Sequence, residues 1–532
     1  MSFGTSFALT TRPTIMGRNA AVVAGHQLAA QAGLRMLQAG GNAIDAAIAV
    51  AAAAAVLKPD ACGLGSDLFL LFAKAGTNEV FALNASGPAP RLATRDAFPS
   101  GIEHLGLRAA SVPGAVDGWY RAITRFGRLA FGDVVAPAIE LAHGAPVSAL
   151  FASTLAKNEE TLRRFPETYR VYYPNGRAPR AGEVLVQSDL ARTLEAIASE
   201  GPQSFYRGAF AQALDKYAKA TGALLRAEDL AGYESEWRDP LRATYRGYEL
   251  IGQPPVSVGI TVLEAMQILE HFPLADLEDS SAERIHMHVE AMKIAMSDMR
   301  GHLGDPAFVS ERAVPELLDR KHAAIRAKEI DPLRARNYEA ASLLAQAGTD
   351  TSYAAVVDGD GNAVSLLQSV YHIFGSGEVI PGTGTLLNNR MTGFSLDPSS
   401  PNALEPGKRT MQTLNPLLVR KDGRAAICLG TPGGPSQTYT NMELLTRLID
   451  DGLEPQRAID APRWFVTPSG ELNVERGVSP DVRAALVALG HRVVDFPAHS
   501  ASFGGAGIIL LSPANVREAA ADPRRETYAL AC

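Results

Sequence analysis

Apolar positions recur with a helical period near the N-terminus of the chain and form short strand-like runs separated by turns in its C-terminal third. Between His26 and Leu57, apolar residues follow helical spacing through Ala30, Leu34 and Leu37. The glycines of Gly40-Gly41-Asn42 interrupt this pattern, and an alanine-rich run follows them. The segment therefore predicts two helices joined by a glycine hinge.

The next stretch changes from strand to helix. A glycine turn after Cys62 leads into an apolar run at Leu68–Ala73, and a shorter run follows at Val80–Asn84; both are typical of strands. Helical patterns then dominate from Gly114 to Arg300. The longest predicted helix covers Ser281–Leu303, because its apolar residues cluster on one side.

The pattern changes to β structure after a charged and alanine-rich stretch that ends near Gly348. Tyr353–Val357 predicts a strand, Asp358–Asn362 a tight turn, and Ala363–Leu367 the returning strand of a hairpin. Further strands are predicted at Leu417–Arg420, Ala425–Leu429 and Gly507–Leu511, helices at Asn441–Asp451 and Pro480–Leu489, and a polar tail at the end. The whole pattern predicts a mixed α/β body without a linker between domains.

Composition and charge narrow the possible functions. With 46% hydrophobic and 20% charged residues the chain is an ordinary globular one, and a net charge of −7 without a basic block argues against nucleic acid as a partner. Three widely spaced cysteines without a CxxC pair predict neither a disulfide framework nor a zinc site. No HExxH motif or phosphate loop occurs, so no metal or other cofactor is predicted.

The N-terminal residues predict a cytoplasmic protein. They contain no apolar core of signal-peptide length behind a basic start. The apolar run Ala43–Leu57 is shorter than the roughly 20 residues that a membrane-spanning helix needs, so a buried helix is expected there and no membrane contact.

Thr351 is the candidate for chemistry, because it opens the first strand of the predicted hairpin. A threonine at such a place is usually only a strand former. If the peptide bond between Asp350 and Thr351 were broken, the Thr351 hydroxyl would lie beside a new α-amino group with a pKa of about 8. That amine can accept the hydroxyl proton at neutral pH, so one residue would supply both nucleophile and base.

A series of short motifs along the chain resembles the γ-glutamyltranspeptidase family of N-terminal-nucleophile hydrolases. The segment Thr351–Asp358 resembles the start of the small subunit in that family. The other motifs, in the order of the family, are Gly40–Ala47, Val112–Trp119, Glu290–Lys293, Leu303–Pro306, Phe374–Gly377, Leu386–Asn389, Thr431–Gly434 and Asp460–Arg463. Each motif is weak alone, whereas their common order over most of the chain is specific.

The resemblance implies a fold, a cleavage site and an oxyanion hole. The fold is a four-layer αββα sandwich, built jointly as one intertwined unit by a large subunit of residues 1–350 and a small subunit of residues 351–532. Cleavage falls between Asp350 and Thr351, and the backbone amides of Gly433 and Gly434 form the oxyanion hole. Glycine suits this role because it lets the backbone approach a tetrahedral intermediate closely. Outside this context the same glycines would indicate only a turn.

The chain departs from the family where the substrate binds. Enzymes that act on γ-glutamyl groups hold the α-carboxylate with an arginine where this chain has Ser86, and the α-amino group with a glutamine and an aspartate where it has Arg390 and Gly393. Gln412 and Thr413 replace the usual serine pair. Arg390 would repel an ammonium group and can bind a carboxylate through two hydrogen bonds, unless it only pairs with a nearby acid as a structural link.

These features predict an autoprocessing heterodimer that hydrolyses an amide in a small substrate with a carboxylate near the scissile carbonyl. Within the family, the oxamate amidohydrolases, which convert oxamate to oxalate, fit best. The segment Leu396–Lys408 is shorter than in relatives with a lid loop, which favours water as acceptor. The alternatives are a γ-glutamyltransferase or glutathione hydrolase, a glutaryl or cephalosporin acylase, and an uncleaved binding or scaffold protein. A higher homo-oligomer remains open.

Overall fold

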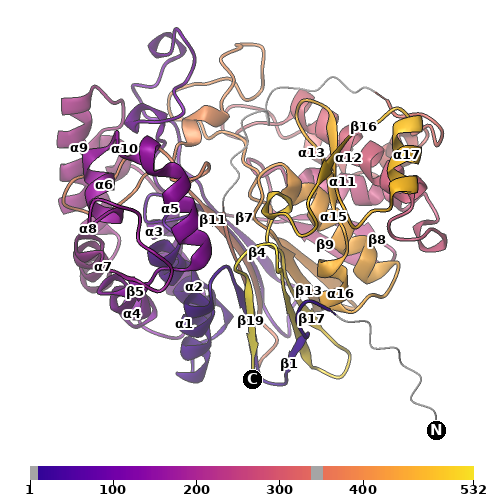
Figure 1. Ribbon diagram of the computed structural model, residues 1–532, viewed down its shortest axis with the longest axis horizontal. Coiled ribbons are helices and arrows are strands. Elements are labelled where there is room, and N and C mark those ends of the chain that lie inside the picture. The colour runs from indigo at the N-terminus through magenta and orange to yellow at the C-terminus, as the bar shows by residue number, and fades with distance from the viewer. Residues whose placement is uncertain (1–9, 337–350) are drawn as a thin grey trace.

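The computed structural model describes residues 10–336 and 351–532, and at its centre two seven-stranded antiparallel sheets pack face to face (Figure 1). Sheet I has the strand order β1-β18-β17-β13-β12-β9-β8, and sheet II the order β19-β2-β10-β11-β3-β4-β7. The strands of sheet I are β1 (Ile15–Gly17), β8 (Leu241–Tyr245), β9 (Tyr248–Gly252), β12 (Leu417–Lys421), β13 (Arg424–Gly430), β17 (Gly507–Leu511) and β18 (Arg517–Ala521). Those of sheet II are β2 (Ala21–Ala24), β3 (Asp67–Ala73), β4 (Val80–Ala85), β7 (Glu236–Arg238), β10 (Ser352–Val357), β11 (Ala363–Ser369) and β19 (Tyr528–Ala531).

Helices flank the two sheets on their outer faces. On sheet II lie α1 (Gln27–Gln38), α2 (Ala43–Leu57), α3 (Ala115–Phe126), α4 (Phe131–Ala142), α7 (Ser188–Glu200), α8 (Gln203–Tyr206) and α9 (Ala209–Thr221). On sheet I lie α11 (Ile260–Leu269), α12 (Ala282–His302), α14 (Arg320–Ala327), α15 (Ser436–Ile449) and α16 (Pro455–Asp460). Figure 1 shows the two groups of helices on opposite sides of the strands. The mixed α/β fold with helices outside two sheets is confirmed.

Smaller elements complete the structure. The two-stranded sheet β5 (Ala145–Pro146) and β6 (Val184–Leu185) lies among the first helices, with α5 (Ala149–Leu162), α6 (Pro166–Tyr172) and α10 (Ala227–Ala231). The three-stranded sheet β14 (Trp464–Val466), β15 (Glu471–Glu475) and β16 (Arg492–Phe496) accompanies α17 (Pro480–Ala488), and α13 (Ala313–Leu317) precedes α14. None of the helices within residues 10–336 and 351–532 is long and apolar enough to cross a membrane.

Residues from both sides of the predicted cleavage site build each sheet. In sheet II, β10 pairs with β2 on one side and with β11 on the other, and β11 pairs with β3. The β10 side chains alternate between two cores: Tyr353, Ala355 and Val357 face sheet I, whereas Ala354 and Val356 face the helices. The β10–β11 hairpin is therefore at the centre of the molecule and could not be removed without exposing both cores.

The predicted pair of N-terminal helices is confirmed, with the break between them at Ala39–Asn42. Helix α2 begins with a capping box, in which the Asn42 and Asp45 side chains each accept hydrogen bonds from the backbone of the first turn. All of its residues are buried, which explains its apolar, alanine-rich sequence. Asp358, in the hairpin turn, accepts a hydrogen bond of 3.0 Å from the Ala43 N–H. This acidic group at the helix N-terminus fixes the hairpin to α2.

Two opposed glycines make room between the sheets for one aromatic ring. Gly430 at the end of β13 pairs with Gly507 of β17. A Cβ atom at Gly430 would lie 2.3 Å from Cε2 of Tyr353, and one at Gly507 would lie 3.1 Å from its Cδ1. The Tyr353 ring therefore fills a slot in sheet I, and it fixes the start of β10 beside the end of β13.

We expect a Gly430→Ala variant to lose about 2 kcal/mol of stability, because the added methyl group overlaps the buried Tyr353 ring and a packed core relaxes only at a cost. Thermal unfolding followed by circular dichroism measures the effect. Gly301→Ala in α12 is the matched control, since its new Cβ meets nothing within 4 Å and should change stability by less than about 1 kcal/mol. Equal midpoints for the two variants would contradict the proposed slot.

Two predictions from the sequence are wrong in detail, and a third is incomplete. The polar tail after Leu511 is not a tail, because it forms β18 and β19 in two different sheets, and the fully buried Asp522 between them pairs with Arg463 at 2.7 Å. The stretch from Gly114 to Arg300 is mostly helical as predicted, but the prediction did not include its short strands β7, β8 and β9. The helix predicted at Asn441 begins at Ser436.

Candidate active site

Thr351 lies immediately before β10, at the place where the sequence predicts a strand to begin. Only 2% of the residue is exposed. Asp350, the residue on the other side of the predicted cleavage site, lies outside the described residues. The hairpin that Thr351 opens is confirmed, because every residue of β10 pairs with a residue of β11.

The register of sheet II places Thr351 in a row with two other polar residues. Ser352 pairs with Gln368 in β11, and the next residue of β11, Ser369, pairs with Asp67 in β3. Continuing the antiparallel register by one residue puts Thr351 beside Ser369. Neighbouring strands are about 4.8 Å apart, so the Cα atoms of Thr351 and Asp67 are separated by about 10 Å.

Arg390 reaches this row from the short 3₁₀ helix Arg390–Gly393. Its side chain is fully buried, and its Nε donates a hydrogen bond of 2.7 Å to Oδ2 of Asp67. The guanidinium carbon lies 4.2 Å from the centre of the Tyr371 ring. Both Nη atoms are buried, and neither has a hydrogen-bond partner in the described structure. The structural link to an acid therefore uses only one nitrogen of Arg390, and two donors stay open for a ligand.

Asp67 belongs to this site, although the sequence pattern does not predict it. Besides Arg390, its carboxylate accepts hydrogen bonds from the Gly87 N–H at 2.9 Å and from Nε2 of Gln412 at 3.1 Å. Burial raises the pKa of the Asp67 carboxyl, and these three donors act in the opposite direction. The sequence signal for Asp67 is an acidic residue directly before an apolar run. The predicted strand begins at Leu68 and therefore does not include Asp67.

Gln412 and Thr413 lie in different surroundings, although they are neighbours in sequence. Gln412 joins Arg390 at Asp67, and its Oε1 is buried without a hydrogen-bond partner in the described structure. With the Gln437 amide oriented to satisfy its hydrogen bonds, Nε2 of Gln437 donates to the Thr413 carbonyl at 2.9 Å. Gln412 thus belongs to the arginine cluster, and Thr413 connects the cluster to helix α15.

Gly433 and Gly434 form the turn between β13 and α15, and both have a positive φ, of 131° and 58°. Because Tyr353 fixes the end of β13 beside the start of β10, this turn lies at the end of β10 that Thr351 occupies. The N-terminus of α15 follows directly and adds partial positive charge. In the same orientation of Gln437, its Oε1 accepts from the Gly434 N–H at 3.3 Å, so an oxyanion would have to replace this long hydrogen bond.

Ser86 occupies the place where the resemblance would put an arginine, and a different arginine approaches it. The Ser86 hydroxyl donates to Oδ1 of Asn84 at 2.6 Å. The Nε of Arg409 donates to the Ser86 carbonyl at 3.0 Å, and its Nη1 pairs with Glu236 at 2.9 Å. Arg409 is therefore a second cation near the site, but Glu236 already neutralises it.

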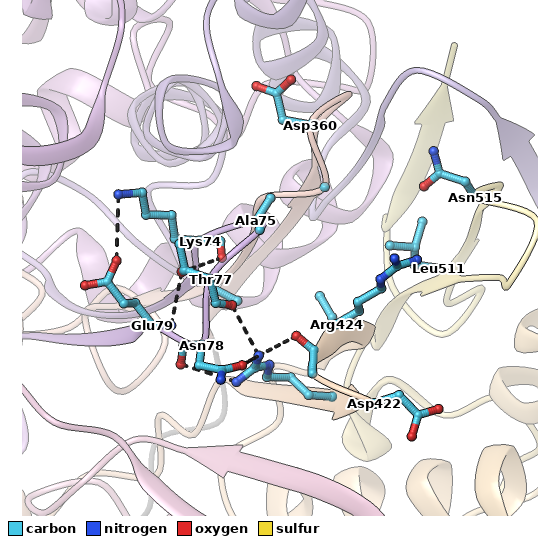
Figure 2. Close-up of a pocket in the computed structure, with 16 residues that line it drawn as sticks. Lys74, Ala75, Thr77, Asn78, Glu79, Asp360, Asp422, Arg424, Leu511 and Asn515 are labelled. Carbon is cyan, nitrogen blue, oxygen red and sulfur yellow. Dashed lines mark hydrogen bonds and ion pairs between the residues drawn. The ribbon is translucent and has the colours of Figure 1, made fainter.

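A large charged cavity lies at the other end of the sheets. It has a volume of about 560 Å³ and is lined by the β3–β4 turn with Lys74 and Glu79, by Asp360 after β10, and by Asp422 and Arg424 at the β12–β13 turn and the start of β13 (Figure 2). The six residues of β10 span about 20 Å between Thr351 and this end. The cavity is therefore separate from the site around Thr351.

Stacked antiparallel sheets with helices on their outer faces, and a threonine at the start of a central strand, define the class of the N-terminal-nucleophile hydrolases. Residues 29–532 match the γ-glutamyltranspeptidase family. The chain belongs to this family, and it is an enzyme, an autoprocessing amidohydrolase made as a single precursor of a large and a small subunit.

Similar proteins carry different activities in their names. The chain is 39% identical over 530 residues to the glutathione hydrolase-like YwrD proenzyme of Bacillus subtilis, which covers 97% of this chain and 99% of the relative. It is 37% identical over 519 residues to the oxamate amidohydrolase proenzyme of Klebsiella pneumoniae, covering 94% and 96%. A crystal structure of cephalosporin acylase from Bacillus halodurans matches with a TM-score of 0.91 and 36% identity, covering 100% and 99%. These similarities support the family and leave its substrate to be argued from the site.

Proposed function

We propose that this enzyme hydrolyses the amide of a small substrate whose carboxylate lies next to the scissile carbonyl, with oxamate as the leading candidate. The single observation that carries the proposal is the buried guanidinium of Arg390, which keeps both Nη atoms without a partner in the described structure. A carboxylate that accepts from both would form the planar, two-bond pair that arginine favours. A substrate ammonium group would meet a cation there.

The chemistry starts with cleavage between Asp350 and Thr351, which gives chains of residues 1–350 and 351–532. The Thr351 hydroxyl oxygen attacks the amide carbon, and the new α-amino group takes its proton. The N–H groups of Gly433 and Gly434 stabilise the negative oxygen of the tetrahedral intermediate. When the C–N bond breaks, the α-ammonium group returns the proton to the departing amine, which for oxamate leaves as ammonia.

Water completes the reaction. It attacks the ester between Thr351 and the acyl group, the α-amino group again takes and returns one proton, and the carboxylic acid leaves with Thr351 restored. For oxamate the product is oxalate. The short segment Leu396–Lys408 supports water as the acceptor, because it spans little chain that could cover the site.

The strand spacing between Thr351 and Asp67, which holds Arg390, favours a short acyl group. The Cα atoms of Thr351 and Asp67 are about 10 Å apart by strand spacing, and Arg390 extends from the Asp67 carboxylate. A substrate whose carboxylate is adjacent to the scissile carbon fits between the Thr351 hydroxyl and the Arg390 guanidinium. A glutaryl group carries its carboxylate several bonds farther away and would need another cation, for which Arg409 is the candidate.

A substrate panel tests the proposal. We expect kcat/KM on oxamate, followed as ammonia release, to exceed that on γ-glutamyl-4-nitroanilide and on glutaryl-4-nitroanilide by at least about 100-fold, equivalent to roughly 2.7 kcal/mol of transition-state stabilisation. The opposite order would replace oxamate hydrolysis with a γ-glutamyl or an acylase activity. Adding glycylglycine as an acceptor should leave the rate unchanged if water is the acceptor.

A further inference from the structure

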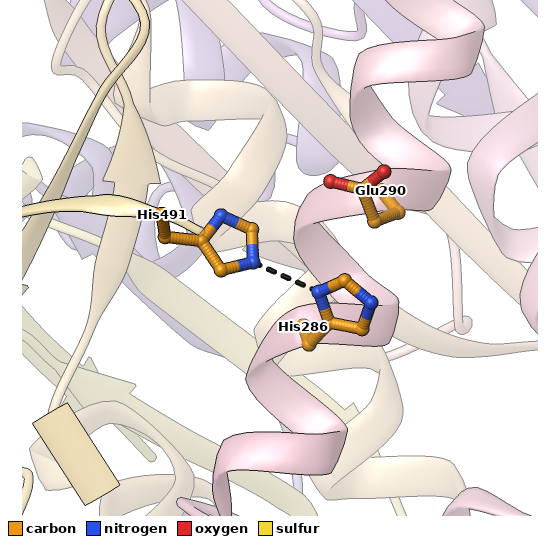
Figure 3. Close-up of side chains that lie close together, drawn as sticks. All are labelled: His286, Glu290 and His491. Carbon is orange, nitrogen blue, oxygen red and sulfur yellow. Dashed lines mark hydrogen bonds between the residues drawn. The ribbon is translucent and has the colours of Figure 1, made fainter. Parts of the chain in front are cut away.

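Helix α12 and the segment after α17 bring three metal-binding side chains together far from Thr351 in sequence. His286 and Glu290 are one helical turn apart on α12, so they lie on the same face. His491 approaches them from the segment after α17 (Figure 3). One possible ligand atom from each of the three residues lies within 4.8 Å of those of the other two.

The hydrogen bonds of His286 orient its ring as in a metal ligand. Its Nε2 lies 2.8 Å from the carbonyl oxygen of Asp331. A carbonyl only accepts, so Nε2 carries the hydrogen and Nδ1 of the neutral ring presents a lone pair. That lone pair points at Nε2 of His491, 2.8 Å away. Metal-binding histidines are commonly fixed by such a bond from the other ring nitrogen to a carbonyl.

The carboxylate of Glu290 completes the set. The side chain is fully buried, as is His286, and His491 is 6% exposed. Oε1 accepts from Nζ of Lys293 at 2.8 Å and Oε2 from the Arg336 N–H at 3.1 Å, and each oxygen keeps a second lone pair. Two imidazoles and one carboxylate are a ligand set that zinc uses, commonly with water as the fourth ligand.

We propose that His286, Glu290 and His491 bind a divalent transition-metal ion of the zinc type. The ion takes the place of the proton shared by the two rings: Nδ1 of His286 and Nε2 of His491 both bind the metal, and the His491 hydrogen moves to its own Nδ1. The ligand nitrogens must separate from 2.8 Å to somewhat over 3 Å, as two Zn–N bonds of about 2.0–2.1 Å require. The ammonium group of Lys293 repels the metal ion and therefore lowers the affinity of the site for it.

The second cluster of this kind in the described structure fits a metal less well. Glu264, Asp298 and His322 also bring their ligand atoms together. Both oxygens of Asp298 accept hydrogen bonds of 2.9 Å from Arg326, so a guanidinium already takes the place of a cation. This cluster therefore serves as an internal comparison for the first.

A metal at the first cluster would connect parts of the chain on both sides of the proposed cleavage. His286 and Glu290 precede residue 350, and His491 follows it. The segment Asp331–Arg336 contacts the same cluster through the Asp331 carbonyl and the Arg336 N–H, and the Ala335 N–H donates to the Leu489 carbonyl at 2.7 Å. The ion would act as a link between the two subunits, close to the residues that lead towards the cleavage site.

Titration of the metal-free, EDTA-treated full protein with Co²⁺ tests the site. We expect one equivalent to bind with the visible absorption of a four- or five-coordinate ion, and Zn²⁺ to displace it. Affinity should fall at least 100-fold in His491→Ala and stay unchanged in His322→Ala and in His499→Ala, which replaces an exposed histidine farther along the chain. Circular dichroism verifies that each variant is folded.

A variant that removes the opposing charge tests the site without breaking it. Lys293→Met should tighten Co²⁺ binding about tenfold, since it removes an ammonium 2.8 Å from the Glu290 carboxylate. Zn²⁺ should also raise the unfolding midpoint of the wild-type protein and not that of His491→Ala. The absence of Co²⁺ binding by the wild type, or its loss in His322→Ala instead of His491→Ala, overturns the proposal. None of these measurements depends on the identity of the amide substrate.

Discussion

A Thr351→Ala variant is expected to stay a single chain of 56.4 kDa and to lose amidohydrolase activity by at least about 1,000-fold. Scaling the mass by 350/532 and 182/532 gives fragments of about 37 and about 19 kDa for the mature wild type. The reason is that the Thr351 hydroxyl is the nucleophile in both reactions, the self-cleavage and the hydrolysis of the amide substrate. Without it no ester forms before β10, so the peptide bond stays intact and no free amine appears. Intact-mass spectrometry and N-terminal sequencing of the small fragment measure the outcome.

Two controls separate the hydroxyl from the fold around it. Thr351→Ser keeps a hydroxyl and should still cleave, at a lower rate. Ser352→Ala changes the adjacent buried residue, which is 5% exposed, and should cleave normally if position 351 alone matters. Cleavage of the Thr351→Ala chain at the same bond, or a wild-type protein that stays whole after long incubation, would remove the basis of the mechanism.

The hairpin around Thr351 could be predicted from sequence because local signals agree there. The apolar run Tyr353–Val357, the turn Asp358–Asn362 and a second apolar run all indicate two short antiparallel strands. The two N-terminal helices are predictable for the same reason, since the glycines of Gly40-Gly41 and the Asn42 cap mark the boundary between them. Local order of this kind does not depend on which distant segment packs against it.

The remaining features depend on distant partners, and sequence patterns do not show these. Strand β19 is a short apolar segment in a stretch that the sequence indicates as a polar tail, but it pairs with β2, some 500 residues earlier. Asp67 looks like the flank of an apolar strand, and only the fold brings Arg390 and Gln412 to its carboxylate. The sequence thus predicted Arg390 and Gln412 as site residues separately, without the acid that connects them.

The connection to Asp67 decides how Arg390 must be tested. Replacing Arg390 alone would leave a buried carboxylate without its cation, which typically lowers the stability of the fold by about 3–5 kcal/mol. A loss of activity could then not be assigned to substrate binding. The double variant Arg390→Met/Asp67→Asn removes both charges and keeps their approximate volumes. The Gly87 N–H can still donate to the remaining oxygen at position 67, and the unpartnered Oε1 of Gln412 can accept from the new amide once Gln412 turns over.

We expect this double variant to lose about 100- to 1,000-fold in kcat/KM on oxamate, because a buried two-bond arginine–carboxylate pair contributes roughly 3–4 kcal/mol and each 1.4 kcal/mol is tenfold. On oxamide, which has an amide in place of the carboxylate, the loss should be less than about tenfold. The ratio of the two losses is the informative quantity, since a general effect on folding or on Thr351 would lower both equally. Equal losses would assign Arg390 a purely structural role, and the carboxylate site would then have to be built around Arg409, whose own variant Arg409→Ala is the next to measure.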